Sequence, residues 1–323
     1  MKKVCVVGFG AIGPIHAEAI INAKKAELYA VCDIDSVKNN EAREKYGVKT
    51  YTDFDEMLAD KDIDSVHICT PHYLHFEMMK KAIYAGKSVV CEKPATMTKA
   101  EFDRLCSLDG ADKICFVLQN RLNPCALKFR EIAKSGGMGK VISAKGILTW
   151  NRTKEYYDSD EWRGKWDTEG GGVLINQAVH TLDFFSYIAG GVRSVKAQMM
   201  NFSLDSIEVE DTFASRLILS DGATGVFFAT NAYGGNSAPE FEVIFEKGIV
   251  RYAQGKLFVD GAIIKEDVLS SKGKAYWGTG HRHLIANYYD ENKYFSIFDV
   301  KNTMDTLFAM YESAKENGKE IML

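Results

Sequence analysis

The sequence has no cysteine after Cys125 and no two cysteines separated by two residues. Five of its seven cysteines lie within short apolar runs: Cys5, Cys32, Cys69, Cys91 and Cys115. Without a metal-ligand spacing, these thiols are expected to fill buried strand positions, a reactive cysteine being the alternative. The pattern predicts no metal site and a protein of the reducing cytoplasm.

Long apolar runs are also absent, since none approaches the roughly 20 residues that cross a membrane. Glycines at positions 8, 10 and 13 interrupt the apolar stretch after Lys2 and Lys3, which argues against a signal peptide. The net charge of -4 gives no reason to expect nucleic acid as a partner. With 323 residues, 46% of them hydrophobic, the chain is long enough for two soluble domains.

Up to residue 121, short apolar runs alternate with helical patterns. Strands are expected at Val4–Val7, Leu28–Cys32, Ser65–Cys69, Val89–Cys91 and Ile114–Leu118, and helices at Pro14–Ala23, Val37–Tyr46, Leu74–Ala85 and Lys99–Leu108. Strands apolar on both faces, separated by helices, predict a parallel sheet, and right-handed crossovers make it a doubly wound Rossmann fold. This first domain is assigned residues 1–121.

The pattern changes near Asn120–Pro124, so residues 122–323 are assigned to a second, α+β domain. Longer alternating segments follow at Val141–Thr149, Val195–Phe202, Thr212–Leu219, Gly225–Thr230, Phe241–Phe245 and Ile249–Ala253. Helices are expected at Val173–Ile188, Leu284–Tyr294 and Asn302–Glu316, the last packing back on the first domain. Together these segments predict a large, mostly antiparallel open sheet with helices covering one face.

The first strand leads into Gly8-Phe9-Gly10-Ala11-Ile12-Gly13. In such a turn, Gly8 permits a tight bend, Gly10 lets the backbone approach a pyrophosphate, and Gly13 allows close packing of helix on strand. The phosphates would meet the free N–H groups at the start of the next helix. The alternative is a glycine-rich turn without a ligand, but the strand before and the helix after it favour a dinucleotide site.

Asp33 ends the second strand, 20 residues beyond Gly13, where a ribose-binding acid is expected. Its carboxylate would accept hydrogen bonds from a ribose diol and repel a 2′-phosphate. Because Ile34, Asp35 and Ser36 supply no arginine, NAD is preferred over NADP. Lys38 is near enough in sequence to leave NADP possible.

An apolar run also ends at Glu92-Lys93-Pro94. A lysine just after a strand of a nucleotide-binding sheet lies where such sheets place their ligands. Pro94 restricts the backbone of Lys93 to an extended conformation, which aims the side chain. The two motifs together predict a nicotinamide enzyme with Lys93 at the reacting carbon.

Four motifs occur in order along the chain: Gly8-x-Gly10-x-x-Gly13-x-x-His16, Thr70-Pro71-His72-x-x-His75, Glu92-Lys93-Pro94 and Gly170-Gly171-Gly172-x-x-x-Asn176-x-x-x-His180. This ordered set resembles the Gfo/Idh/MocA family of glucose–fructose oxidoreductases and inositol dehydrogenases. The resemblance implies that the cofactor contacts Gly8, Phe9, Gly10, Ala11, Ile12, Gly13, Asp33, Thr70, Pro71, His75, Glu92, Lys93 and Asn120. For His75, capping or packing of the helix is the alternative.

The resemblance further implies that Lys93 is the catalytic lysine and that His180 binds substrate or relays a proton. Asn176 would bind substrate from the same helix face, four residues before His180. The family often has aspartate at that position, so the asparagine leaves Lys93 or His180 as the base. The alternatives are a surface lysine and a core histidine.

Trp162 and Arg163 lie in an aromatic and basic cluster that Tyr156 and Tyr157 begin. As substrate-binding residues, they would stack on a sugar and hold an anion bidentately. The alternative is a structured loop whose tryptophans pack under the sheet. In the binding role, the cluster points to an anionic sugar such as a uronate or nucleotide sugar.

The function expected from these motifs is NAD(P)-dependent hydride transfer to or from a sugar, sugar acid, nucleotide sugar or cyclitol hydroxyl. The alternatives are an elimination or glycoside-cleaving enzyme with recycled cofactor, and a nucleotide-sensing regulator. Apolar alternation at Val226, Phe228, Val243 and Phe245 predicts a homodimer or homotetramer built on the exposed sheet face. No membrane partner is expected.

Overall fold

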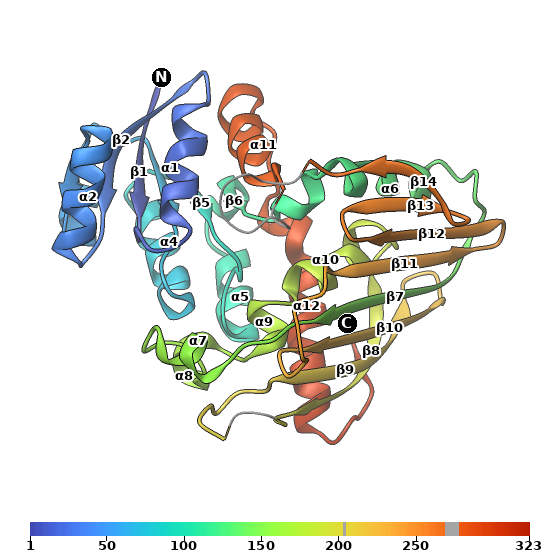
Figure 1. The fold of residues 1–323 in the computed structure, drawn as a ribbon. Helices are drawn as coiled ribbons and strands as arrows, with labels where there is room; N and C mark the ends of the chain where they lie inside the picture. Colours follow the sequence, from blue (N-terminus) through green and yellow to red (C-terminus); the bar gives the residue numbers. More distant parts are fainter. Residues whose placement is uncertain (203–204, 269–277) are drawn as a thin grey trace. The chain divides into compact units, whose positions relative to one another are not determined.

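The computed structural model describes residues 1–202, 205–268 and 278–323, which form two compact units (Figure 1). The first unit consists of Met1–Thr96, Ala100–Gln119 and Thr279–Val300. The second consists of Met97–Lys99, Asn120–Gly278 and Lys301–Leu323. No helix among the described residues is both long enough and apolar enough to cross a membrane.

The first unit is built on a sheet of six parallel strands in the order β3-β2-β1-β4-β5-β6. The strands are β1 Lys2–Val7, β2 Ala26–Cys32, β3 Lys49–Tyr51, β4 Ser65–Ile68, β5 Ser88–Cys91 and β6 Ile114–Phe116. Every residue of β4 and β6 is buried, as expected of strands covered on both faces. The predicted doubly wound parallel sheet is confirmed.

The helices of this unit are α1 Gly13–Ile21, α2 Ser36–Tyr46, α3 Phe54–Ala59, α4 His75–Tyr84, α5 Lys99–Cys106 and α11 Gly280–Ala286, and a π-helix follows at Asn287–Glu291. Capping residues set their limits: the Asp35 side chain accepts from the N–H of Val37, and Gly47 ends α2 with φ 68°. The returning helix α11 packs against α1. Sequence analysis missed β3 and α3.

The second unit is built on a nine-stranded sheet in the order β14-β13-β12-β11-β7-β10-β9-β8-β15. Its strands are β7 Val141–Thr149, β8 Val192–Met200, β9 Thr212–Leu219, β10 Thr224–Thr230, β11 Glu240–Phe245, β12 Gly248–Ala253, β13 Lys256–Val259, β14 Ala262–Glu266 and β15 Ile321–Met322. Neighbouring strands are antiparallel except β7 and β10, which run parallel. The predicted mostly antiparallel sheet is confirmed.

Helices of the second unit pack against its sheet: α6 against β12, β13 and β14, α9 against β9 and β10, and α10 against β7 and β11. They are α6 Pro124–Lys134, α7 Lys154–Asp158, α8 Trp166–Glu169, α9 Val173–Asn176 and α10 Val179–Tyr187, and α12 spans Ile297–Lys315. Phenylalanines fill the space between, with the rings of Phe185 and Phe241 5.0 Å apart. The core of this unit therefore lies between the sheet and its helices.

Two expectations for the second unit are wrong. The helix expected at Val173–Ile188 is two helices, because the Ala178 N–H bonds to the carbonyl of Val173 at 2.8 Å and the longer turn ends α9. In β11, Val243 and Phe245 are buried rather than exposed, since alternation turns them toward the core. Val226 of β10, by contrast, is 51% exposed.

Candidate functional site

The glycine-rich turn after β1 is tied directly to the end of β2. The backbone N–H of Phe9 donates to Oδ2 of Asp33 at 2.6 Å, and the N–H of Asp35 donates to Oδ1 at 2.9 Å. A carboxylate accepts about four hydrogen bonds, so Asp33 retains acceptor capacity for a ribose diol. The structure thus brings together the two motifs that sequence analysis placed at the cofactor.

The turn itself has room only for glycine at two positions. Gly8 adopts φ +85°, and a Cβ there would lie 2.7 Å from the carbonyl oxygen of Cys69. A Cβ on Gly13 would lie 2.5 Å from the carbonyl oxygen of Gly8, whereas Gly10 faces open space. No side chain caps the start of α1, so this cradle fits a pyrophosphate at a helix N-terminus.

His75 links the loop after β4 to the loop after β5. Its Nδ1 lies 2.8 Å from the carbonyl oxygen of Pro94, and its Nε2 lies 2.9 Å from that of Thr70. Burial lowers the pKa of His75 against both contacts, so a neutral ring donates to one carbonyl at a time. The side chain is buried, and it positions the Pro71 and Lys93 loops inside the first unit.

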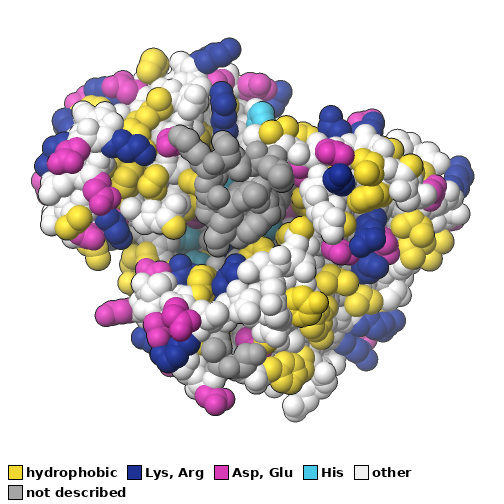
Figure 2. Space-filling model, viewed as in Figure 1, with side chains coloured by type: hydrophobic (Ala, Val, Ile, Leu, Met, Phe, Trp, Pro, Cys, Tyr) yellow, Lys and Arg dark blue, Asp and Glu magenta, His cyan; other side chains and the backbone are white. Residues whose placement is uncertain are grey.

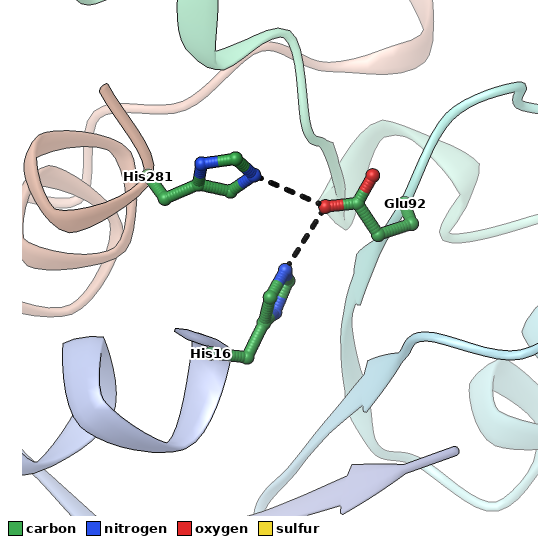
Figure 3. A group of neighbouring side chains, drawn as sticks. All are labelled: His16, Glu92 and His281. Atoms are coloured by element: carbon green, nitrogen blue, oxygen red, sulfur yellow. Dashed lines mark hydrogen bonds and ion pairs between the residues drawn. The ribbon is translucent and has the colours of Figure 1, made fainter. Parts of the chain in front are cut away.

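A buried carboxylate stands beside the lysine of the third motif. Oε1 of Glu92 accepts from Nε2 of His16 at 3.1 Å and lies 3.4 Å from Nε2 of His281, as Figure 3 shows. Its other oxygen accepts from the backbone N–H of Lys93 at 3.2 Å. Burial alone would raise the pKa of Glu92, but the hydrogen bonds from the two histidines hold it well below its usual value.

A chain of hydrogen bonds continues from His16 into the sheet. Its Nδ1 lies 2.9 Å from Nδ1 of His67, whose Nε2 lies 2.8 Å from the hydroxyl of Tyr289. The hydroxyl of Ser65 lies 2.8 Å from that same tyrosine oxygen. Burial lowers the pKa of both histidines, so the rings are neutral. A single arrangement of protons then satisfies every contact: Ser65 donates to Tyr289, Tyr289 to His67, His67 to His16, and His16 to the ionised Glu92.

The three groups of Figure 3 are also potential metal ligands, since one atom from each lies within 4.8 Å of the others. The hydrogen bonds just described satisfy all three without a cation. The expectation of no metal site stays a prediction. What the cluster does is fix an ionised carboxylate and, through it, the backbone at Lys93, whose own side chain is half-buried.

In the second unit, the triple glycine allows two buried polar groups to approach the chain. A Cβ on Gly171 would lie 2.0 Å from the hydroxyl oxygen of Tyr311, and one on Gly172 would lie 1.8 Å from the carbonyl oxygen of Glu210. The Glu210 carboxylate accepts from the N–H groups of Gly172 at 2.9 Å and Leu174 at 3.1 Å. Burial raises the pKa of Glu210 to about 7.

Asn176, at the end of α9, is held by a buried acid that sequence analysis did not single out. Its Nδ2 donates to Oε1 of Glu169 at 2.5 Å and to the hydroxyl of Tyr156 at 3.4 Å. Glu169 is fully buried and also accepts from the N–H of Gly164 at 2.5 Å. A carboxylate thus lies next to position 176 although the residue there is an asparagine.

His180, in the first turn of α10, is half-buried. Asp183 of the same helix is buried and accepts a bidentate pair from Arg121, with N–O distances of 2.6 and 2.7 Å. Thr303 donates to the same carboxylate at 2.7 Å. Asp183 therefore fastens α10 to the segment carrying Asn120, as a supporting partner.

Trp162 and Arg163 lie together within the second unit. The guanidinium of Arg163 lies 4.7 Å from the Trp162 ring and 4.3 Å from the Tyr156 ring, and it pairs with Asp160 at 2.9 Å. Trp166 has a packing role, since its indole N–H donates to the carbonyl of Glu208 and its ring meets Tyr311. The cluster thus combines an arginine among aromatic rings, as expected of a sugar-binding site, with a packed tryptophan, as expected of a structured loop.

The sequence analysis included His16 only as part of a motif and singled out none of His67, His281, Tyr289, Glu169 and Glu210. The spacing of His16 after Gly13 was one available signal, because it puts the ring on the first turn of α1. The others meet their partners only through the fold. Asp33 is brought to the Gly8–Gly13 turn within the first unit. In the second unit Asn176 and Arg163 contact Tyr156, and Trp162 packs against Arg163.

Comparison with known proteins agrees with this architecture. Residues 2–118 match the sequence model of an oxidoreductase family with an NAD-binding Rossmann fold. Residues 126–251 match the GFO/IDH/MocA C-terminal domain. A relative, myo-inositol 2-dehydrogenase of Thermotoga maritima, is 30% identical over 226 residues, which are 69% of this chain and 60% of that protein. The match thus spans less than two thirds of that relative's length.

Two solved structures are similar over the whole chain. The WlbA dehydrogenase of Bordetella pertussis, in complex with NADH and UDP-GlcNAcA, superposes with a TM-score of 0.87 at 26% identity, covering 100% of this chain and 98% of that one. The WlbA dehydrogenase of Chromobacterium violaceum, with the same two ligands, gives 0.86 at 28% identity, covering 100% and 96%.

Proposed function

The chain belongs to the Gfo/Idh/MocA family of oxidoreductases, and we propose that it transfers a hydride between NAD and a hydroxyl-bearing carbon of a sugar-type substrate. The nicotinamide supplies the hydride chemistry. The observation that carries the proposal is Lys93, which directly follows β5 in a nucleotide-binding sheet and whose backbone N–H is held by the ionised Glu92. A lysine fixed there can take the hydroxyl proton as a carbonyl forms.

The cofactor role is assigned to the turn from Gly8 to Gly13, to Asp33, and to the loops carrying Thr70, Pro71, His75, Glu92, Lys93 and Asn120. Asp33 supports NAD over NADP, because its carboxylate is held in place by Phe9 and Asp35 while Ile34 is 92% exposed. Residues 1–121 are proposed as the cofactor domain and residues 122–323 as the substrate and oligomerisation domain.

The substrate role is assigned to Asn176, His180, Trp162 and Arg163. The Glu169–Asn176 contact supports this, because the asparagine is oriented by a buried acid and can present its amide oxygen to a sugar hydroxyl. His180 is the proposed hydroxyl partner and alternative proton acceptor. The UDP-GlcNAcA complexes of both WlbA enzymes support nucleotide sugars and sugar acids within the proposed class.

We further propose a homo-oligomer that forms through the sheet face opposite the helices. Support comes from exposed apolar residues on the second unit, where Val226 is 51% and Ile249 is 41% exposed. Figure 2 shows hydrophobic side chains lying among charged ones on the visible surface. Light scattering at micromolar concentration tests this: a monomer would end it. The seven free cysteines support a reducing, cytoplasmic location.

The proposed activity is tested by screening neutral sugars, cyclitols, uronates and nucleotide sugars with NAD and following NADH absorbance. Formation of NADH with one class, and its loss in Lys93→Met, is the expected result. Tight NADH binding without net turnover on any substrate would contradict a dehydrogenase and favour recycled cofactor or a sensor.

A further inference from the structure

A pocket of about 430 Å³ lies where two parallel strands of the second unit end. It is lined by Asn151, Arg152, Thr153, Tyr156, Gly234, Gly235 and Asn236. Six of these residues come from the loops after β7 and β10, the parallel pair of this sheet, and Tyr156 lies in α7, which follows β7. Carboxyl ends of adjacent parallel strands are a common place for ligands, and this volume falls within the usual range for small molecules.

Arg152 is the single charged residue of that lining, and its contacts leave the charge uncompensated. Nη1 donates to the carbonyl of Asn151 at 2.7 Å and to Oδ1 of Asn236 at 2.8 Å. The guanidinium lies 4.7 Å from the Trp150 ring and 5.2 Å from the Tyr156 ring. Nε is buried without a hydrogen-bond acceptor within the described part of the chain.

Other cations nearby contrast with Arg152. Lys154 pairs with Asp158, and Arg163 pairs with Asp160 at 2.9 Å. The contacts of Arg152 in residues 1–202, 205–268 and 278–323 are oxygen acceptors and rings, none of them a carboxylate. The Nε–Nη2 edge of a guanidinium is a fork that carboxylates and phosphates engage bidentately. A half-buried cation held in place without a counter-charge suits an anionic ligand.

Tyr156 adds a second donor that lacks an acceptor. Its hydroxyl oxygen accepts hydrogen bonds from Nη1 of Arg163 and from Nε2 of Gln177 at 2.9 Å. A longer contact, at 3.4 Å, comes from Nδ2 of Asn176. Oε1 of Gln177 accepts from Asn231 at 3.0 Å, which fixes the orientation of that amide. A neutral phenol oxygen has two lone pairs, so the contacts from Arg163 and Gln177 already fill its acceptor capacity. The phenol proton is then left to donate, and the hydrogen bonds of the described residues include no acceptor for it. Burial raises the pKa of Tyr156, against the effect of Arg163, and so keeps that proton in place.

We propose that this pocket binds the oxyanion of an acidic sugar substrate, a carboxylate or phosphate, with Arg152 as its charged anchor and the Tyr156 hydroxyl as a second donor. That the bound anion is part of the substrate rests on the proposed function, whereas anion binding itself rests on the pocket alone. Tyr156 also contacts Asn176, the last residue of α9, and Gln177, which lies between α9 and the helix carrying His180. The anchor is therefore continuous with the substrate residues of the same unit.

Calorimetric titration of the full chain with four probes tests the proposal: UDP, D-glucose 1-phosphate, D-glucuronate and neutral D-glucose. Phosphate and carboxylate probes separate the two sources of an oxyanion. Wild type is expected to bind at least one anionic probe more tightly than glucose. Arg152→Gln should weaken that binding on the order of 10- to 100-fold, the scale of a charge-assisted hydrogen bond.

Lys154→Gln is the matched control. It removes a positive charge only two residues from Arg152, and the Lys154 side chain is 61% exposed. Its affinities should stay within about twofold of wild type, because a surface charge contributes little. Arg152→Lys keeps the charge and loses the fork, so intermediate binding is expected. This variant also decides the matter if Arg152→Gln does not fold, which thermal unfolding and NADH titration would reveal.

Equal weakening by Arg152→Gln and Lys154→Gln, or no preference of wild type for any anionic probe, would overturn the proposal. The readout is independent of turnover. Anion binding that depends on Arg152 in a protein that reduces no NAD would leave the pocket assigned and refute the dehydrogenase. Turnover of neutral sugars without anion binding would support the dehydrogenase and refute the anion pocket.

Discussion

Each unit contains a buried glutamate, and the surroundings of Glu92 and Glu210 give the two carboxyls opposite titration behaviour. Burial acts to raise the pKa of both carboxyls, by disfavouring their charged form. Hydrogen bonds from His16 and His281 outweigh burial at Glu92, so its pKa lies well below the usual range. Glu210 receives backbone N–H groups and the hydroxyl of Tyr311 instead, and its pKa is raised to about 7.

The difference shows that donor type, more than burial, decides the charge of these groups. Imidazoles beside Glu92 keep a fixed negative charge next to Lys93 across the neutral range. The backbone N–H groups and the Tyr311 hydroxyl at Glu210 compensate burial less fully, so the pKa of that carboxyl is about 7. The first unit thus contains a carboxylate, Glu92, that stays ionised at neutral pH. The second contains a carboxyl group, Glu210, whose protonation changes near pH 7.

The largest expected effect comes from removing the fixed charge. Glu92→Ala leaves the ring N–H groups of His16 and His281 without their acceptor, and each buried donor left unsatisfied costs about 1–3 kcal/mol of unfolding free energy. Denaturant unfolding at neutral pH measures it. Glu77→Ala is the control, because that side chain is 54% exposed and its loss should cost about 0.5 kcal/mol or less. A cost for Glu92→Ala as small as the control's would contradict the network.

A somewhat smaller effect distinguishes the two carboxyls by pH. For Glu210 the folded pKa lies above the ordinary 4.5, so its contribution to stability is present below pH 4.5 and lost as pH rises to about 7. Across that window Glu210→Gln should remove a decline of roughly 3 kcal/mol. For Glu92 the folded pKa is depressed, so stability is lost as pH falls below 4.5.

Unfolding midpoints measured from pH 4 to 8 compare wild type with Glu210→Gln, and with Glu161→Gln as an exposed control. Parallel pH curves for wild type and Glu210→Gln would show that this carboxyl does not titrate as stated.

The smallest effect concerns cofactor choice. Asp33→Ser with Ile34→Arg removes repulsion and supplies a phosphate partner, so NADPH affinity should rise on the order of 10-fold while NADH affinity falls. The structure sharpens this expectation, because Asp33 also holds the N–H of Phe9. Ile34→Arg alone keeps that bond and should raise NADPH affinity without weakening NADH. Tighter binding of NADPH than NADH by wild type would show that the assignment of Asp33 is wrong.

Local signals sufficed for much of the first unit. Gly8, Gly13 and Asp33 follow strand ends that alternation and glycine punctuation mark clearly, and parallel strands bring such ends to one edge. In the second unit, β7 and β9 have the predicted bounds, because each alternates cleanly between turn residues. β14 was missed since all its residues are exposed, which leaves no apolar alternation to read.

The rest depended on contacts that no local pattern encodes. No residue in the apolar run from Val173 to Ile188 predicts the wider turn at Ala178, whose N–H bonds to the carbonyl of Val173. The pocket at Arg152 requires knowing that β7 and β10 are parallel neighbours, although β9 and a long segment separate them in sequence. His16, His67 and Tyr289 come from distant parts of the chain and form one network only in the folded unit.

The central claim is that Lys93 exchanges the substrate proton, and single-turnover hydride transfer in Lys93→Met tests it most directly. The variant keeps the apolar stem and deletes the amine. With NADH saturating, hydride transfer should slow on the order of 10²-fold or more, the usual scale of general acid–base help. Lys113→Met, at an exposed lysine before β6, should transfer hydride as wild type does. A Lys93→Met rate within a few-fold of wild type would contradict the account and leave Lys93 a structural residue.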